Sequence, residues 1–121
     1  MALILVVEDD ADNQELLTRF LRRQGHRVVH AIDGLSGVKT AEECVPDLIL
    51  MDLGLPGLDG WEATQRIRAN PKTAHIPIIA LTAHALSGDV NRAVEVGIDA
   101  YETKPVVYQR LMGKITTFVG P

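Results

Sequence analysis

Carboxylate side chains follow two of the most apolar runs in the chain. Glu8 and Asp9 come directly after residues 3–7, and Asp52 comes directly after residues 48–51. If both runs are buried parallel strands of one sheet, their carboxyl ends meet at the same edge and the acidic groups lie close together. Carboxylates that repel each other need a cation, and their oxygens are ligands that Mg²⁺ prefers. The sequence therefore predicts a divalent metal beside a reactive aspartate.

Polar side chains also follow the last two apolar runs. Thr82 and its small neighbour Ala83 come after the fourth run, and Lys104 comes after the fifth. A hydroxyl and an ammonium that face a metal-bound aspartate neutralise the oxygens of a transferred phosphoryl group, and such stabilisation supplies most of the catalysis of this reaction. A carboxylate accepts a phosphoryl group as an acyl phosphate. We therefore predict that Asp52 is the nucleophile, in a pocket completed by Thr82, Ala83 and Lys104.

Short apolar runs alternate with longer amphipathic segments, which is the pattern of βα units on a parallel sheet. The strands of the expected α/β fold are residues 3–7, 27–31, 48–51, 77–81 and 100–103. Right-handed crossovers leave few possible sheets, and the flavodoxin-like doubly wound (βα)5 order 2-1-3-4-5 is the commonest for this length. In that order the winding reverses between strands 1 and 3, where ligands bind. Those two strands carry the carboxylates.

Capping residues mark where the helices are expected to begin. Asp12 with Glu15, and Asp59 with Glu62, resemble capping boxes at the starts of the first and third helices. Pro105 suits the first turn of the fifth helix.

Helical spacing of apolar residues indicates which side chains face the core. The fourth helix is expected to start near Ser87, and Cys44 is expected to be buried on the second. The expected core-facing residues are Leu16, Leu17, Phe20 and Leu21; Leu35, Val38 and Ala41; Trp61, Ala63 and Ile67; Val90, Ala93 and Val94; and some of Val107, Leu111, Met112, Ile115 and Phe118.

Composition narrows the class of protein. The 121 residues, 46% of them hydrophobic, suit one globular domain with one core. The lone Cys44 excludes an internal disulfide and favours a reducing compartment, so the cytoplasm is expected. No basic leader precedes the first apolar run and no apolar stretch reaches the length of a bilayer span, so neither secretion nor membrane insertion is expected. The net charge of −4 argues against direct nucleic-acid binding.

Four segments, in this order, resemble the motifs of bacterial response-regulator receiver domains of the CheY-like superfamily, specifically the stand-alone single-domain type. They are VVEDD at residues 6–10, DLILMDLGLPGLDG at 47–60, LTA at 81–83 and KP at 104–105. The resemblance spans nearly the whole chain. It implies one receiver domain over residues 1–121, without an output domain, that acts as a switch in two-component or phosphorelay signalling.

The resemblance implies a specific metal and phosphorylation site. Asp52 accepts phosphate from a phosphohistidine, Asp9 and Asp52 ligate Mg²⁺ or Mn²⁺, and the backbone carbonyl of Gly54 is a third ligand. Glu8 acts through a metal-bound water. We assign the acidic pair to Glu8 and Asp9 because both directly follow the strand, and expect Asp10 only to adjust the local field.

The resemblance also implies a switching mechanism. Thr82 and Lys104 match the hydroxyl and amine that contact the phosphoryl group, and Lys104-Pro105 matches a peptide bond that is usually cis. Phosphorylation is expected to draw Thr82 toward the phosphoryl oxygens and to let Tyr101 rotate inward. The face made by the fourth helix, fifth strand and fifth helix then changes what it binds.

Partners and phosphoryl lifetime follow from the same resemblance. The donor is expected to be a sensor histidine kinase or a histidine phosphotransfer protein, which meets the outer face of the first helix around Gln14, Thr18 and Arg22. A downstream protein is the target, and the chain is expected to be a monomer or weak dimer. Gly54 and His84 occupy the two positions that modulate dephosphorylation.

A magnesium-dependent phosphohydrolase that works through an aspartyl phosphate would use similar residues. Such an enzyme needs an acid/base aspartate, commonly two residues after the nucleophile, and Gly54 stands there. The absence of a cap insertion to enclose a substrate also argues against turnover. A binding module that is not phosphorylated would keep the same fold, and a receiver cut from a larger hybrid kinase would carry the same motifs.

Overall fold

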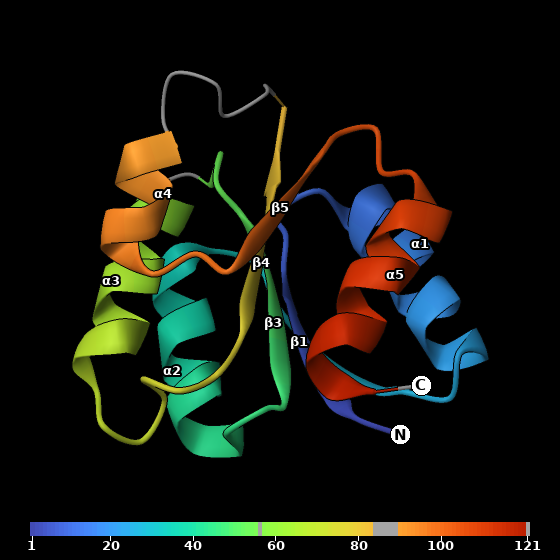
Figure 1. Cartoon of the computed structure of the whole chain (residues 1–121), viewed down its shortest axis with the longest axis horizontal. Coiled ribbons are helices and arrows are strands. Elements are labelled where there is room, and N and C mark those ends of the chain that lie inside the picture. The colour runs from blue at the N-terminus through green and yellow to red at the C-terminus, as the bar shows by residue number, and fades with distance from the viewer. Residues whose placement is uncertain (56, 84–89, 121) are drawn as a thin grey trace.

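Five parallel strands form a single sheet in the order β2-β1-β3-β4-β5, and helices cover both faces (Figure 1). The computed structural model describes residues 1–55, 57–83 and 90–120. The predicted α/β fold and strand order are confirmed. The strands are β1 (Leu3–Val7), β2 (Arg27–Ala31), β3 (Leu48–Asp52), β4 (Ile78–Thr82) and β5 (Ala100–Thr103), and the helices are α1 (Ala11–Arg23), α2 (Gly34–Cys44), α3 (Gly60–Ala69), α4 (Val90–Val96) and α5 (Tyr108–Val119).

The sheet separates two apolar layers. Helices α1 and α5 cover one face, and α2, α3 and α4 cover the other (Figure 1). Strands β3 and β4 are buried along their whole length, because both faces are covered and each strand has neighbours on both sides. Both strands run one residue beyond the predicted ends, so Asp52 and Thr82 belong to the strands themselves. Pro77 lies just before β4, not within it.

Several core predictions are wrong at the edges of helices. Leu16, Leu35 and Val94 are 52%, 62% and 71% exposed, although each fits the apolar spacing of its helix. A period of 3.6 residues defines a stripe wider than the face that the sheet covers, so residues at the margin of the stripe point outward. Val107 is also exposed, whereas Leu111 and Ile115 are fully buried, as predicted for α5. Cys44 ends α2 and is exposed, not buried.

Of the predicted helix starts that fall on described residues, only that of α3 is correct. Asp59 caps α3, and its side chain accepts a hydrogen bond from the Glu62 N–H. The cap of α1 is Asp10, not Asp12, so the helix starts two residues earlier than predicted. Pro105 precedes α5, which starts at Tyr108. The predicted start near Ser87 lies outside the described residues. Within the described chain, no helix is long and apolar enough to span a membrane.

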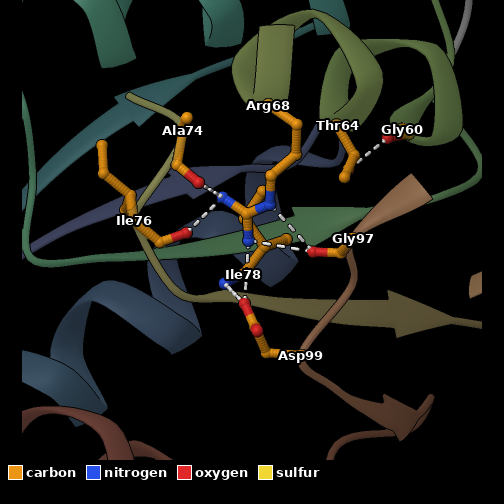
Figure 2. A network of polar contacts seen from close by, with 8 residues as sticks. All are labelled: Gly60, Thr64, Arg68, Ala74, Ile76, Ile78, Gly97 and Asp99. Carbon is orange, nitrogen blue, oxygen red and sulfur yellow. Dashed lines mark hydrogen bonds and ion pairs between the residues drawn. The ribbon is translucent and has the colours of Figure 1, made fainter. Parts of the chain in front are cut away.

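Arg68, near the end of α3, connects three separate parts of the chain (Figure 2). Its guanidinium donates to the carbonyls of Ala74 and Ile76 at 3.0 and 2.6 Å, and to the Gly97 carbonyl from two nitrogens at 3.1 and 2.9 Å. It also pairs with Asp99 at 2.8 Å, and the same Asp99 oxygen accepts the Ile78 N–H. The guanidinium thus joins α3 to the start of β4 and to the link between α4 and β5.

Replacing Arg68 should destabilise the fold. Arg68→Met keeps the apolar stem but leaves three carbonyls and the Asp99 carboxylate without their donor, so we expect a loss of about 2–3 kcal/mol in the free energy of unfolding. Urea titration followed by circular dichroism measures it. Arg66→Met, on the exposed side of the same helix, is the control and should change stability by less than about 0.5 kcal/mol. Equal effects of the two substitutions would contradict this role for Arg68.

Candidate functional site

The acidic groups of β1 and β3 converge at the carboxyl edge of the sheet. Val7 pairs with Met51 in the parallel register, so the residues that follow, Glu8 and Asp52, emerge side by side. Ligand oxygens of Glu8, Asp9 and Asp52 all lie within 4.8 Å of one another. Glu8 and Asp52 are buried, whereas Asp9 is exposed. The sheet order therefore gathers two buried carboxylates and one solvent-facing carboxylate into one cluster.

Lys104 reaches this cluster from the end of β5. Its Nζ lies 2.7 Å from a Glu8 oxygen and 3.1 Å from Asp52 Oδ2. The Lys104 N–H donates to the Thr82 carbonyl at 2.7 Å, which holds the lysine beside β4. One ammonium thus faces two buried carboxylates.

The local electrostatics reflect this crowding. Burial raises the pKa of Glu8, the Lys104 hydrogen bond opposes that rise, and the neighbouring Asp52 adds to it. For Lys104, burial alone would lower the pKa, but hydrogen bonds and charge attraction from Glu8 and Asp52 outweigh burial and raise it. The Lys104 ammonium is therefore held in its charged form. Burial and the neighbouring Asp52 disfavour the charged form of Glu8.

The loop after β3 shapes the surroundings of Asp52. The Gly54 N–H donates to Asp52 Oδ1 at 2.9 Å. Gly60, the first residue of α3, packs so tightly that a Cβ there would collide with the Asp52 carbonyl oxygen. A residue without a side chain is required at that position, because α3 starts directly against the end of β3.

The remaining predicted site residues lie around this cluster. Thr82 is buried at the end of β4, and Ala83 is exposed beside it. Tyr101 is 40% exposed and pairs in register with Ala80. The Lys104-Pro105 peptide bond is cis, as the resemblance implied. His84 lies outside the described residues.

Two residues near the cluster have roles that sequence reasoning missed. Asp10 caps α1 by accepting the Asn13 N–H, and its own N–H donates to Glu8. Gln14, which was expected on the outer face of the first helix, is half-buried and donates to the Glu8 carbonyl at 3.3 Å. An aspartate directly before a helical segment is a common N-cap, so the sequence pattern could have indicated Asp10 as the cap of α1. No local pattern indicates the contact of Gln14.

A hollow of about 520 Å³ opens next to the cluster, between α1 and the segment that leads into α5. Its mouth combines the charges of Glu8 and Lys104 with apolar side chains. The other lining residues are Asn13, Leu16, Leu17, Pro105, Val106 and Tyr108. The hollow explains why Leu16 remains exposed: it forms part of an open apolar wall beside the acidic site.

The donor set suits a hard divalent cation. All the candidate ligand atoms are oxygens, and carboxylates with backbone carbonyls and waters are the ligands that Mg²⁺ takes. A soft metal is disfavoured, because the cluster in the described chain contains no thiolate or imidazole.

Comparison with known proteins agrees with this fold and site. The sequence matches the response regulator receiver domain family over residues 4–116. It is 35% identical to the polar-differentiation response regulator DivK of Brucella anthropi over 117 residues, which cover 97% of this chain and 95% of that protein.

Solved structures agree as well. The receiver domain of sensor histidine kinase PA1611 from Pseudomonas aeruginosa, with a magnesium ion in its active-site cleft, has a TM-score of 0.90 and 41% identity, covering 99% of this chain and 98% of that one. The structure of the Saccharomyces cerevisiae phosphotransfer protein Ypd1 with the receiver domain of Ssk1 gives a TM-score of 0.86 and 36% identity, covering 96% and 87%.

The fold and site define a doubly wound α/β protein with an acidic site at its topological switch point. The chain belongs to the response regulator receiver domain family. It is therefore a receiver domain of two-component or phosphorelay signalling, a class whose members are signalling switches.

Removing the Lys104 charge should expose the repulsion within the cluster. Lys104→Gln leaves Glu8 and Asp52 buried without a cation, so we expect a loss of about 2–4 kcal/mol in unfolding free energy without divalent metal. Mg²⁺ should then raise the melting temperature more in the variant than in the native protein. Differential scanning calorimetry with and without Mg²⁺ tests both points.

Lys39→Gln provides the matched control, because Lys39 is exposed on α2 and makes no ion pair in the described chain. A Lys104→Gln protein as stable as this control in metal-free buffer would contradict the proposed balance of charges.

Proposed function

We propose that the chain accepts a phosphoryl group on Asp52 from a phosphohistidine, in the presence of Mg²⁺, and signals by changing what it binds. The observation that carries this proposal is the cluster in which Asp52 lies beside Glu8, Asp9 and the Lys104 ammonium. Such a cluster combines a nucleophile, candidate metal ligands and a fixed cation at one sheet edge. The chain is in this view a switch that catalyses only its own phosphorylation and dephosphorylation.

The chemistry proceeds in one transfer. A carboxylate oxygen of Asp52 forms a bond to phosphorus as the P–N bond of the donor imidazole breaks, and the electron pair of that bond returns to the imidazole. Lys104, already 3.1 Å from Asp52, stabilises the developing charge on the phosphoryl oxygens. Thr82, with the adjacent Ala83 backbone, supplies the facing polar groups at the end of β4.

The proposed metal ligands are Asp9, Asp52 and the Gly54 carbonyl, with Glu8 acting through a water. When bound, Mg²⁺ neutralises negative charge on the carboxylates and on the transferred phosphoryl group. The magnesium in the related PA1611 receiver supports this assignment. Mn²⁺ has similar ligand preferences and is expected to substitute.

Output is proposed to run through the face made by α4, β5 and α5. Thr82 moves toward the phosphoryl group, Tyr101 turns inward from its half-exposed position, and a downstream protein recognises the altered face. Gly54 and His84 are proposed to set the lifetime of the phosphoryl group by controlling water access.

The donor is proposed to dock on α1 and the hollow beside Lys104. Leu16 and Pro105 give this wall an apolar character. Gln14, Thr18 and Arg22 line a separate hollow that also includes His30, and Thr18 is buried, so its predicted place on the outer face of the first helix is wrong. A kinase or phosphotransfer domain that presents a helix with a phosphohistidine fits an apolar wall next to the acidic site. The complex of Ypd1 with the Ssk1 receiver supports a donor of this class.

The chain is proposed to act as a single-domain receiver in the cytoplasm, as a monomer or weak dimer, without direct contact to nucleic acid. Its similarity to DivK supports this context. A second context is a receiver within a larger sensor kinase, and the 41% identity to the PA1611 receiver favours it. The chemistry at Asp52 is the same in both contexts, and the sequence of the complete gene distinguishes them.

We expect Asp52 to be the one residue that carries the phosphoryl group. With acetyl phosphate and Mg²⁺, intact-mass spectrometry should detect one added phosphoryl group, and Asp52→Asn should abolish it because an amide cannot form the acyl phosphate. Asp12→Asn, at an exposed acid on α1, should label like the native chain. Labelling of Asp52→Asn would refute the assignment, and multiple turnovers of a general phosphatase substrate would favour a phosphohydrolase.

Leu16 should matter for the protein donor but not for a small donor. Leu16→Asp places a charge on the apolar wall, so we expect phosphotransfer from a phosphorylated histidine phosphotransfer protein to slow about tenfold or more. Labelling by acetyl phosphate should stay within about twofold, because a small donor does not need the apolar wall for docking. Leu35→Asp, at another exposed leucine, on α2, should alter neither rate. Equal rates for Leu16→Asp and native protein would exclude this docking surface.

A further inference from the structure

Positive charge is concentrated on the surface around the end of α1 and strand β2. Residues 19–30 contain four arginines and none of the sixteen acidic residues of the chain. The other residues therefore hold eight Lys and Arg side chains against sixteen acids. The four arginines and the nearby His30 are exposed. We call this group the cationic strip, and its members are Arg19, Arg22, Arg23, Arg27 and His30.

Contacts within the domain account for only part of the cationic strip. Arg19 pairs with Glu15 at 2.7 Å. Arg22 and Arg23 lie in the last turn of α1, where cations complement the helix dipole, but Arg27 belongs to β2. Within the described chain, Arg22, Arg23 and Arg27 have no acidic partner. Most of the charge of the strip is therefore available to another molecule.

A hollow of about 320 Å³ lies between α1 and β2, and part of the cationic strip lines it. Arg19 and Arg22 reach it from α1, and His30 reaches it from β2. The His30 Nε2 lies 3.1 Å from Thr18 Oγ1, which holds the imidazole against α1. Among the lining residues that the structure describes, Glu15 is the one acid, and it is already paired. The hollow shares no lining residue with the apolar wall proposed for the donor.

Strand β2 forms one edge of the sheet and pairs with β1 on its inner side. The Arg27 N–H donates to the Ala2 carbonyl at 2.9 Å, so Arg27 and every second residue after it direct their backbone groups to β1. The N–H and C=O groups of the residues between them, Val28 and His30, point away from β1. An edge of this kind can accept a further strand.

We propose that the β2 edge binds an extended acidic segment of another protein, which adds to the sheet as a further strand. Side chains alternate across a sheet, so one set in the added strand lies on the α1 side, beside Arg19, Arg22 and His30. Acidic side chains there complement the cationic strip. On the opposite side, Val29 is half-buried against the core and suits β-branched neighbours. The expected segment alternates acidic and β-branched residues.

Other occupants fit these features less well. A second copy of the chain that paired through its own β2 would place two cationic strips against each other, and like charges on an edge deter such pairing. A nucleic-acid duplex or a membrane is a broad anionic surface, which the acidic remainder of the chain would repel. A single extended segment contacts the edge and the strip without facing that remainder. The proposal goes beyond the proposed function and does not depend on phosphorylation of Asp52.

A synthetic peptide of alternating glutamate and valine, GEVEVEVEVG, tests the proposal. The fluorescein-labelled peptide is titrated with the full chain, and binding is followed by fluorescence anisotropy. We expect saturable binding that weakens about fivefold or more when NaCl is raised from about 0.05 M to about 0.3 M. GKVKVKVKVG reverses the charge, and GEPEPEPEPG keeps the charge but cannot form a regular strand. Both control peptides should bind at least about tenfold more weakly.

A charge reversal in the chain tests the cationic strip. Arg22→Glu should weaken binding of GEVEVEVEVG about fivefold or more, because it replaces an attraction by a repulsion beside the β2 edge. Circular dichroism checks that the variant is folded. Lys72→Glu makes the same change of charge at an exposed residue between α3 and β4, and should alter the affinity by less than about twofold.

Amide hydrogen exchange, followed by NMR, tests the backbone pairing. The peptide should slow exchange at the outward N–H groups of Val28 and His30, which an added strand would bond. Binding without this protection would exclude strand addition. Absence of saturable binding, equal binding of GKVKVKVKVG, or equal affinities of Arg22→Glu and the native chain would also overturn the proposal. Tighter binding of a short DNA duplex or of phosphatidylglycerol vesicles than of the peptide would assign the strip to a nucleic acid or a membrane instead.

Discussion

The contact of the Lys104 ammonium with Glu8 and Asp52 is the interaction on which the site depends. These two carboxylates are buried at neighbouring strand ends, with ligand oxygens within 4.8 Å, where two negative charges repel by roughly 3–4 kcal/mol at an effective dielectric constant near 20. The lysine comes from β5, two strands away from β3, and so ties β1, β3 and β5 to one point. Because the Glu8 and Asp52 carboxylates repel each other, their arrangement is stable only while a cation lies beside them. A change of charge at Asp52 therefore changes the forces on Lys104.

Strand β5 is an edge strand that charged contacts hold at three places. Asp99, just before it, pairs with Arg68 of α3, and Lys104, just after it, reaches the acidic cluster. Between them, the buried Glu102 pairs with Arg110 and Lys114 of α5. Burial alone would raise the pKa of Glu102, but hydrogen bonds to the two cations outweigh burial and lower it. The three contacts join β5 to α3, to α5 and to the acidic cluster. A shift of β5 would therefore change its contacts with all three.

The strands, which depend on local sequence pattern, were predicted correctly. The strand positions were correct to within one residue because short apolar runs alternate with longer amphipathic segments, and the strand order then placed Glu8, Asp52, Thr82 and Lys104 at one edge. Helix caps and burial were less predictable. Asp10 and Asp12 have the same capping chemistry, and only the geometry of the β1–α1 turn selects Asp10. The sequence gives no signal for the role of Arg68, because Gly97 and Asp99 lie about thirty residues away and most of the groups that Arg68 contacts are backbone carbonyls.

The arrangement of charges also gives the proposed switch a direction. The acidic groups belong to β1 and β3, whereas Thr82 and Lys104, the groups that would turn toward a phosphoryl anion, belong to β4 and β5. Phosphorylation replaces one negative charge on Asp52 by nearly two, and the attraction then falls on the β4 and β5 side of the site. On that side lies α4, whose buried side chains among the described residues are Ala93 and Val96, whereas β1, β3 and β4 are packed between covered faces. The reacting carboxylate therefore stands on a strand with neighbours on both sides, whereas the change in charge acts on groups next to the edge strand β5.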